Sequence, residues 1–232
     1  MDFRKLNLTL LPKIRLTIYA VAFLLLVASY FISAGTKGFA SIELANDAGF
    51  LSFAFISLAL VVTPLRVVLP QFPFNSSLNY GRRAFGVSAF IFALVHYVLQ
   101  MNFLFNWDVA KVLQSDGFTG NAFLAGYVAL AILFILSITS FDWVVQKLGK
   151  KWYALHKLVY LAYPLIIYHA VKIGLDFQNV NLYSGLFFTV AGITIILEIA
   201  RLYKTFSKKP ASTTSTQATP TETTEPTRPT SP

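Results

Sequence analysis

The sequence predicts an all-α protein of the membrane, a bundle of six transmembrane helices. Of its 232 residues, 56% are hydrophobic and only 12% are charged, whereas soluble domains carry about 25% charged residues. Six apolar stretches are also long enough to cross the hydrocarbon core of a bilayer, which takes about 20 helical residues. We place these stretches at 15–34, 49–69, 84–105, 121–140, 154–173 and 182–203.

The first apolar stretch resembles a secretory signal peptide, because basic residues precede or begin it. These residues are Arg4, Lys5, Lys13 and Arg15. No convincing small-residue cleavage pattern follows the stretch, however, and five more apolar stretches do. We therefore predict a retained first helix, preceded by a short N-terminal segment, 1–14.

Polar connections separate the five later stretches. Lysine and arginine are concentrated in every second connection. Connections rich in these residues face the cytoplasm. They lie between the second and third stretches, between the fourth and fifth, and after the sixth: Arg66, Arg82, Arg83, Lys147, Lys150, Lys151, Lys157, Arg201, Lys204, Lys208 and Lys209. The other connections mix lysine with acidic residues: Lys37, Lys111, Lys172, Glu43, Asp47, Asp108, Asp116 and Asp176. The sequence therefore predicts that both termini lie in the cytoplasm.

The end of the chain has a different composition from the rest. From Pro210 onward it consists of threonine, proline and serine with a few charges, and such a segment cannot bury an apolar face. We therefore divide the chain into the N-terminal segment, a six-helix domain at 15–203, and a disordered cytoplasmic tail at 204–232.

The composition excludes several classes of function. The chain has no cysteine, so it forms no disulfide, iron–sulfur cluster or cysteine-linked heme. It contains no Gly-rich dinucleotide fingerprint and no phosphate-binding loop motif, so reducing equivalents must come from another molecule. Its net charge of +9 is spread between apolar segments rather than gathered on one soluble face. We predict lipid contacts and no nucleic-acid partner.

The chemistry points to the three histidines, which lie inside or at the ends of the apolar stretches. An imidazole in hydrocarbon is costly, so an intramembrane histidine marks a functional site by default. His96, in the third stretch, and His169, in the fifth, are predicted at similar depth in the outer half of the bilayer. Two imidazoles at one depth on two helices make an axial pair for a b-type heme in the bundle core. The alternative is that each histidine only hydrogen-bonds a neighbouring helix.

His156 is predicted near the cytoplasmic surface. It lies 13 residues before His169, a rise of about 20 Å on an ideal helix, which would place a second heme towards the inner face. The same spacing leaves the two rings about 140° apart in azimuth, unless Pro164 or an altered helical repeat reorients them. The sequence therefore allows one heme or two.

Arg82 precedes His96 by 14 residues, about 21 Å along an ideal helix, and Arg83 lies beside it. The two arginines have two interpretations. Either guanidinium could clamp a propionate of an inner heme through paired hydrogen bonds, or both could serve only to orient the protein. Direct ligation of iron by Arg82 would require its guanidinium to lose a proton.

Seven segments together resemble the ferric reductase-like transmembrane domain family. The likeness covers about 15–203. The parts of the chain that carry the likeness are Pro64–Arg66, Gly81–Gly86, Ala93–His96, Ile138–Ser140, Lys147–Trp152, Leu155–Leu161 and His169. The resemblance implies a six-helix b-type cytochrome in the bacterial inner membrane. It also implies that His96, His156 and His169 are heme ligands, and it maps the arginine before the family's third helix onto Arg82.

Within the family, the closest likeness is to heme-binding membrane subunits of bacterial periplasmic methionine sulfoxide reductase systems. This likeness implies that electrons pass from quinol or a cytoplasmic flavin reductase, through heme, to a periplasmic molybdopterin-dependent enzyme that repairs methionine sulfoxide. The chain would then be an electron-transfer subunit of an oxidoreductase. Members of the family have been linked to FMN, although no residue here indicates a flavin site.

Two other functions compete with this interpretation. A stand-alone ferric or cupric reductase would deliver electrons directly to external metal. A transporter or channel would use the histidines as a proton relay, but such proteins tend to have internal repeats and broken helices. No internal repeat is apparent in this sequence.

Overall fold

The computed structural model describes residues 10–37, 42–108, 110–111, 117–174 and 181–207, and all its regular structure there is helical. Six helices are long and apolar enough to cross a membrane, at Pro12–Gly35, Ile42–Val68, Asn75–Phe105, Thr119–Ile138, Lys150–Ile173 and Leu182–Phe206. The prediction of an all-α, six-helix bundle is confirmed, and the chain is a multi-pass membrane protein. The predicted Thr/Pro-rich tail lies, from residue 208 onward, outside the described residues.

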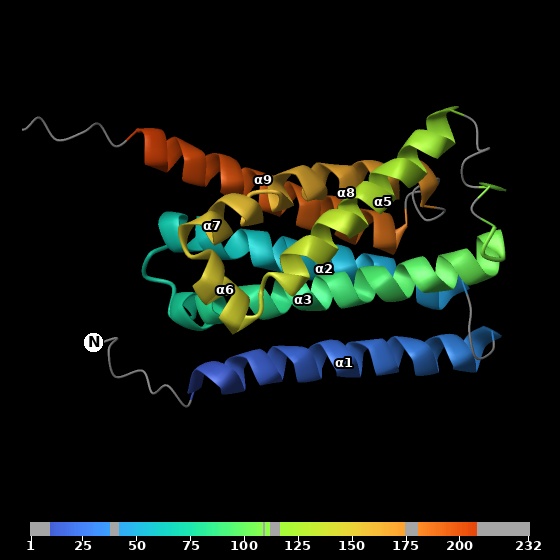
Figure 1. Ribbon diagram of the computed structural model, residues 1–232, viewed down its shortest axis with the longest axis horizontal. Helices are drawn as coiled ribbons and strands as arrows, with labels where there is room; N and C mark the ends of the chain where they lie inside the picture. The colour runs from blue at the N-terminus through green and yellow to red at the C-terminus, as the bar shows by residue number, and fades with distance from the viewer. Residues whose placement is uncertain (1–9, 38–41, 109, 112–116, 175–180, 208–232) are drawn as a thin grey trace, which may run out of the picture.

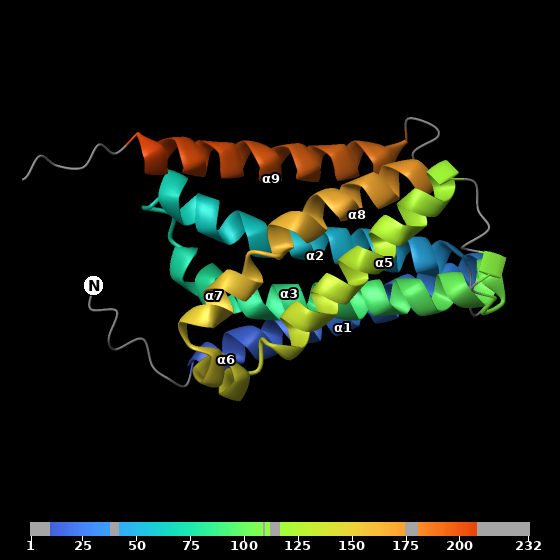
Figure 2. The ribbon, with the colours of Figure 1, turned by 45° about the horizontal axis from the view of Figure 1, so that its top comes forward.

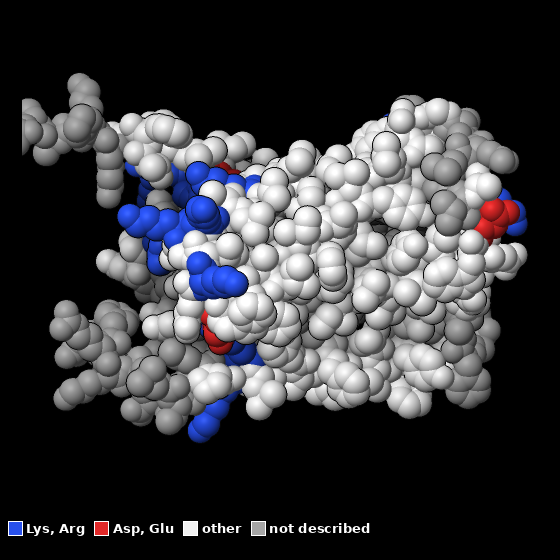
Figure 3. All heavy atoms as spheres, viewed as in Figure 1, with Lys and Arg blue, Asp and Glu red and all other residues white. Residues whose placement is uncertain are grey.

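The helices run up and down between two ends of the bundle (Figures 1 and 2). In chain order the elements are α1 (Leu10–Lys37), α2 (Ile42–Val68), α3 (Asn75–Gln100), the π-helical segment η2 (Met101–Phe105), α5 (Gly117–Ile138), α6 (Asp142–Leu148), α7 (Lys150–His156), α8 (Val159–Ile173) and α9 (Leu182–Phe206). We call the end where α1 begins and α9 ends the basic end, and the opposite one the far end. Figure 3 shows lysine and arginine side chains gathered at the basic end.

Helix α2 forms the centre of the bundle. It packs along α3 on one side and against α9 on another, while α5 pairs with α8 and α1 lies outside α3 (Figure 1). In an 18-residue apolar stretch of α2, 56% of the residues are buried, compared with 11% in the corresponding stretch of α1. Helices in lipid associate through close van der Waals packing rather than through a hydrophobic driving force. The central position of α2 therefore reflects how well its side chains interlock with their neighbours.

Phe53 of α2 shows how this packing positions the rest of the bundle. Its ring is 2% exposed and stacks on Phe187 of α9 and Tyr163 of α8, with centroids 4.0 Å and 5.7 Å away. One turn away, the Ser57 hydroxyl is 3.0 Å from the Tyr163 hydroxyl. Ser52 donates a hydrogen bond to the carbonyl oxygen of Ala89 on α3 at 2.9 Å. Aromatic stacking and buried hydrogen bonds together fix α3, α8 and α9 around α2.

The boundaries of three spans differ from the prediction by several residues. Helix α2 begins at Ile42 rather than near residue 49. Helix α3 begins at Asn75 rather than near residue 84, so Arg82 and Arg83 lie within the helix rather than in the connection before it. The polar residues of its first turns hid this start, because they interrupt the apolar pattern without interrupting the backbone hydrogen bonds.

The fifth span is divided at Lys157–Leu158 into α7 and α8. Hydrogen bonds of the i to i+3 type cross this break, including one from the Tyr160 amide to the Lys157 carbonyl oxygen at 3.0 Å. These bonds tighten the turn, so the helical repeat changes between His156 and His169. Pro164 itself lies inside α8.

The connection from α5 to α6 is held by an ion-pair network at the basic end. Asp142 lies 3.0 Å from a guanidinium nitrogen of Arg15 on α1 and 2.6 Å from one of Arg83 on α3. Arg83 also donates to the carbonyl oxygen of Ser140 at 3.1 Å. Partial burial opposes ionisation, but the hydrogen bonds and charges of Arg83 and Arg15 outweigh it and lower the pKa of Asp142. The network therefore links three segments at neutral pH.

Candidate functional site

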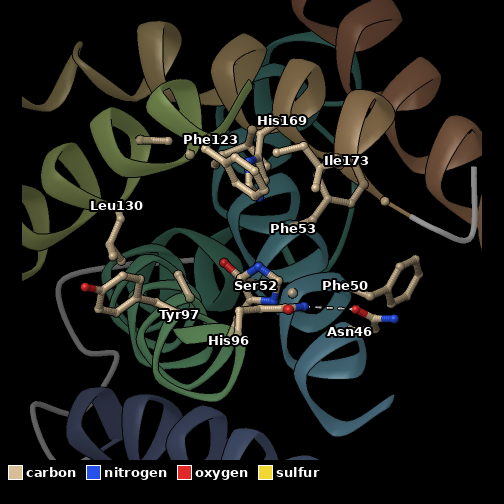
Figure 4. A pocket seen from close by; sticks show the side chains of 18 of the residues that line it. Asn46, Phe50, Ser52, Phe53, His96, Tyr97, Phe123, Leu130, His169 and Ile173 are labelled. Carbon is tan, nitrogen blue, oxygen red and sulfur yellow. Dashed lines mark hydrogen bonds between the residues drawn. The ribbon is translucent and has the colours of Figure 1, made fainter. Parts of the chain in front are cut away.

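A cavity of about 220 Å³ lies in the far half of the bundle, between α2, α3, α5 and α8. Its walls are mostly apolar and aromatic, and residues of η2 and α9 complete them. Figure 4 shows His96 pointing into the space from α3 and His169 pointing into it from α8. Concave apolar sites with a few convergent polar groups are the usual form of a cofactor site.

The structure brings His96 and His169 together, at the matched depth that the sequence predicted. Their ring centroids are 6.1 Å apart, and their ring planes make an angle of 89°. The two residues come from helices that are not adjacent in the chain, so the pair depends on how α2, α3, α5 and α8 pack around the cavity. Their role as ligands stays a prediction.

The Nδ1 atom of His96 lies 2.7 Å from the carbonyl oxygen of Ala45 on α2. A carbonyl oxygen only accepts hydrogen bonds, so Nδ1 carries the proton and donates it. In a neutral imidazole the other nitrogen, Nε2, then holds the free lone pair. The same ring also lies against Gly49, one turn further along α2.

His169 has the equivalent environment on the other helix pair. Its Nδ1 atom lies 2.9 Å from the carbonyl oxygen of Ala122 on α5, and its ring lies against Gly126. By the same reasoning Nδ1 donates and Nε2 holds the lone pair. When neutral, both rings therefore have the same tautomer, with the proton on Nδ1 and the lone pair on Nε2.

His156 lies apart from this cavity, near the basic end. Its Nε2 atom is 3.3 Å from the hydroxyl of Ser140, and its Nδ1 atom is 3.2 Å from the carbonyl oxygen of Trp152. The ring also stacks on the indole of Trp152, with centroids 3.9 Å apart. Both ring nitrogens of His156 thus have protein partners.

The two predicted arginines have different partners. Arg82 donates to the hydroxyl of Thr63 at 2.9 Å and lies within electrostatic range of Glu198. Arg83 is engaged in the network with Asp142. The structure therefore leaves Arg82, rather than Arg83, with a guanidinium that is not paired directly with a carboxylate among the described residues.

Sequence reasoning missed a polar cluster beside Arg82. Glu198 and Arg201 of α9 form an ion pair at 2.9 Å. Tyr160 of α8 donates to Glu198 at 3.3 Å, and the guanidinium of Arg201 lies 5.7 Å from the centre of the Tyr160 ring. A glutamate in the last apolar stretch was the available signal, because acidic residues inside membrane helices are rare and usually paired.

Sequence reasoning also missed Ala45, Gly49, Ala122 and Gly126, the backbone positions that hold the two histidine rings. Small residues are common where membrane helices pack closely. Nothing about one alanine or glycine therefore distinguishes a position that supports a histidine from one that only allows close packing.

The donor set of the cavity suits one kind of metal centre. The described residues contain no group of three or more histidine, cysteine or acidic side chains that could hold a bare metal ion. Two imidazoles alone are enough for a heme iron, because the porphyrin supplies the other four nitrogens. The two lone pairs at Nε2 and the apolar walls fit such a group.

A family model described as "Ferric reductase like transmembrane component" matches residues 48–167, just over half of the chain. Similar proteins from Brucella anthropi and Brucella ovis are both named protein-methionine-sulfoxide reductase heme-binding subunit MsrQ. The first is 32% identical over 147 residues, which cover 62% of this chain and 64% of the relative. The second is 29% identical over 163 residues, which cover 70% of each protein.

Proposed function

The chain belongs to the ferric reductase-like transmembrane family, and from that premise we propose that it is a b-type cytochrome that carries electrons across a membrane. The observation that carries the proposal is the pair of buried imidazoles, His96 and His169, that share one cavity. The Brucella relatives named as heme-binding subunits support the same cofactor.

The separation of the two rings supports axial ligation of one iron. An imidazole nitrogen binds a first-row metal at about 2 Å and lies about 1 Å from its own ring centroid, so two rings on one iron have centroids about 6 Å apart. The observed separation is 6.1 Å. Heme bound between them would supply a reversible one-electron carrier.

The protein groups around the pair then have defined tasks. The carbonyl oxygens of Ala45 and Ala122 accept hydrogen bonds from Nδ1–H of His96 and His169, which keeps each Nε2 free and makes the imidazoles better electron donors. Phe53, Phe123 and Leu133 contribute apolar walls that exclude water, and solvent exclusion is one of the means by which a protein sets a redox potential.

The distribution of charge supports a direction for electron flow. The basic end would face the cytoplasm, with both termini there and the chain in a bacterial inner membrane. The cavity lies towards the far end, which would be periplasmic. We propose that quinol or a cytoplasmic flavin reductase donates electrons. The acceptor would be a methionine sulfoxide reductase subunit, which the names of the relatives support. That this subunit is periplasmic and molybdopterin-dependent stays a prediction from the resemblance.

Residues 15–203 would form the domain that carries the electrons. An inner heme held by His156 and Arg82 stays a prediction. For His156 to bind iron through Nε2, its contact with Ser140 at 3.3 Å would have to break. Arg82 is the better candidate for a propionate clamp, because Arg83 is already paired with Asp142. FMN stays a prediction from the resemblance.

The proposal is tested by following electrons through the purified chain in liposomes. We expect a b-type reduced-minus-oxidised spectrum, reduction of the heme by a quinol, and reoxidation by an acceptor added on the far side. A colourless protein that binds no added hemin would refute the proposal. Metal reduction at the surface of cells that lack any methionine sulfoxide reductase partner would instead indicate a stand-alone ferric or cupric reductase.

A further inference from the structure

Each histidine of the cavity contacts a segment with the same short sequence pattern, which occurs once on α2 and once on α5. The segments are Ala45–Gly49, with the sequence ANDAG, and Ala122–Gly126, with the sequence AFLAG. In each, the first alanine supplies the carbonyl oxygen that binds the histidine, and the final glycine lies against its ring. We call this pattern, Ala-x-x-Ala-Gly, the histidine rest.

The spacing within each histidine rest has a physical reason. Residues four apart lie on the same face of a helix, one turn from each other. The carbonyl oxygen of the first alanine has two lone pairs, so it can accept from the helix backbone and from the histidine. The second alanine of each rest, Ala48 or Ala125, is also buried, which lets the partner helix approach closely.

Only glycine fits at the last position of each segment, because the histidine ring occupies the space that a Cβ atom would need. A Cβ atom on Gly126 would lie 2.5 Å from Nδ1 and 2.7 Å from Cε1 of His169. A Cβ atom on Gly49 would lie 2.9 Å from Nδ1 of His96. Real Cβ atoms essentially never approach other atoms within 3.0 Å, so even alanine at either position would displace the imidazole.

The two rests also relate the two halves of the bundle. His96 follows Ala45 by 51 residues and His169 follows Ala122 by 47. In each half, a histidine near the end of one helix of an antiparallel pair meets the beginning of the other helix. The sequence shows no long repeat, but the structure pairs α2 with α3 as it pairs α5 with α8.

We propose that the two histidine rests are positioning elements that fix the tautomer and the rotation of His96 and His169, and so hold their ring planes crossed at 89°. The inference rests on the proposed function only for the identity of the iron cofactor between the rings. Crossed axial imidazoles give low-spin ferric heme a strongly anisotropic electron paramagnetic resonance spectrum, whereas parallel rings give a more rhombic one. Each glycine would therefore affect the electronic state of a bound iron through the rotation of the neighbouring imidazole ring.

The test compares Gly126→Ala and Gly49→Ala with Gly86→Ala and Gly192→Ala in the full-length protein loaded with hemin. The control glycines lie on α3 and α9, and an added Cβ there would meet nothing within 4 Å. We expect both rest variants to change the resonance spectrum and the midpoint potential, and to lower hemin affinity by about 10- to 100-fold, as loss of outer-shell partners does. The effect should be larger for Gly126→Ala. Unchanged spectra and potentials in both variants would overturn the proposal.

A second measurement covers variants that bind no heme. Nuclear magnetic resonance of the heme-free, ¹⁵N-histidine-labelled chain reports the tautomer of each ring. We expect protonated Nδ1 in both His96 and His169, and loss of that tautomer only in the ring next to the substituted glycine. Retention of it in both rest variants would overturn the proposal. Because this readout needs no heme, it separates failure of the histidine rests from failure of the proposed cytochrome function.

Discussion

At the far end of the bundle two histidines face each other across a cavity, whereas at the basic end one histidine faces protein groups. His96 and His169 each use Nδ1 for a backbone carbonyl oxygen, and among the described residues no group hydrogen-bonds Nε2 of either ring. His156 uses Nδ1 for Trp152 and Nε2 for Ser140, and its ring stacks on an indole. An imidazole in a membrane helix can therefore be either a poised ligand or a satisfied structural group, and the partner of Nε2 distinguishes them.

The largest difference between the two ends is expected when a histidine is replaced by glycine, because this removes the imidazole ring and leaves a small cavity. We expect His169→Gly to reduce hemin affinity by more than the 10- to 100-fold typical of an outer-shell change, because an axial ligand is lost. Free imidazole in the buffer should restore binding and the low-spin spectrum, since it can occupy the space that the ring leaves. Hemin titration with and without imidazole measures both effects.

His156→Gly is the matched control for that experiment. It should leave the far-end heme in place, and imidazole should not change its spectrum. If His156→Gly instead lost the heme and free imidazole restored it, His156 would be a heme ligand rather than a structural group.

A smaller effect is expected from Ser140→Ala, which removes the hydroxyl beside Nε2 of His156. Loss of one half-buried hydrogen bond should lower the free energy of unfolding by about 1 kcal/mol, measured as a lower thermal midpoint in detergent. The spectrum of the far-end heme should not change. A rise in heme per protein in this variant would show that the Ser140 hydroxyl prevents His156 from binding a second heme.

The smallest effect concerns Asp142, which pairs with Arg15 and Arg83 at the basic end. Its lowered pKa means that the ion pairs stabilise the fold above the ordinary carboxyl value of 3.8 and are lost as pH falls through the lower folded value. Since Asp142 is 63% exposed, Asp142→Asn should cost at most about 1 kcal/mol. The thermal midpoints of the wild type and the variant should differ at neutral pH but not at low pH. An equal difference at both would exclude the ionic contribution.

The overall fold was predictable because the bilayer imposes a simple rule on the sequence. Each span needs about 20 apolar residues, and all six stretches correspond to helices of the structure. The start of α3 at Asn75 and the break after His156 were not predictable in detail. Both depend on backbone hydrogen bonds in segments whose side chains are partly polar.

The candidate site was predictable only in part. The depths of His96 and His169 follow from helix geometry, so their meeting could be expected. Their support by Ala45, Gly49, Ala122 and Gly126 depends on which helices pack together, and the one-dimensional pattern does not encode that pairing. The same limit hid the ion pair of Glu198 with Arg201, which the structure places beside Tyr160.

The heme-to-protein ratio of three variants purified in parallel decides whether His96 and His169 are the axial pair of one heme. We expect His96→Ala and His169→Ala each to lose the far-end heme, and His156→Ala to keep it with an unchanged low-spin spectrum. Retention of a wild-type ratio and spectrum by His96→Ala or His169→Ala would contradict the claim.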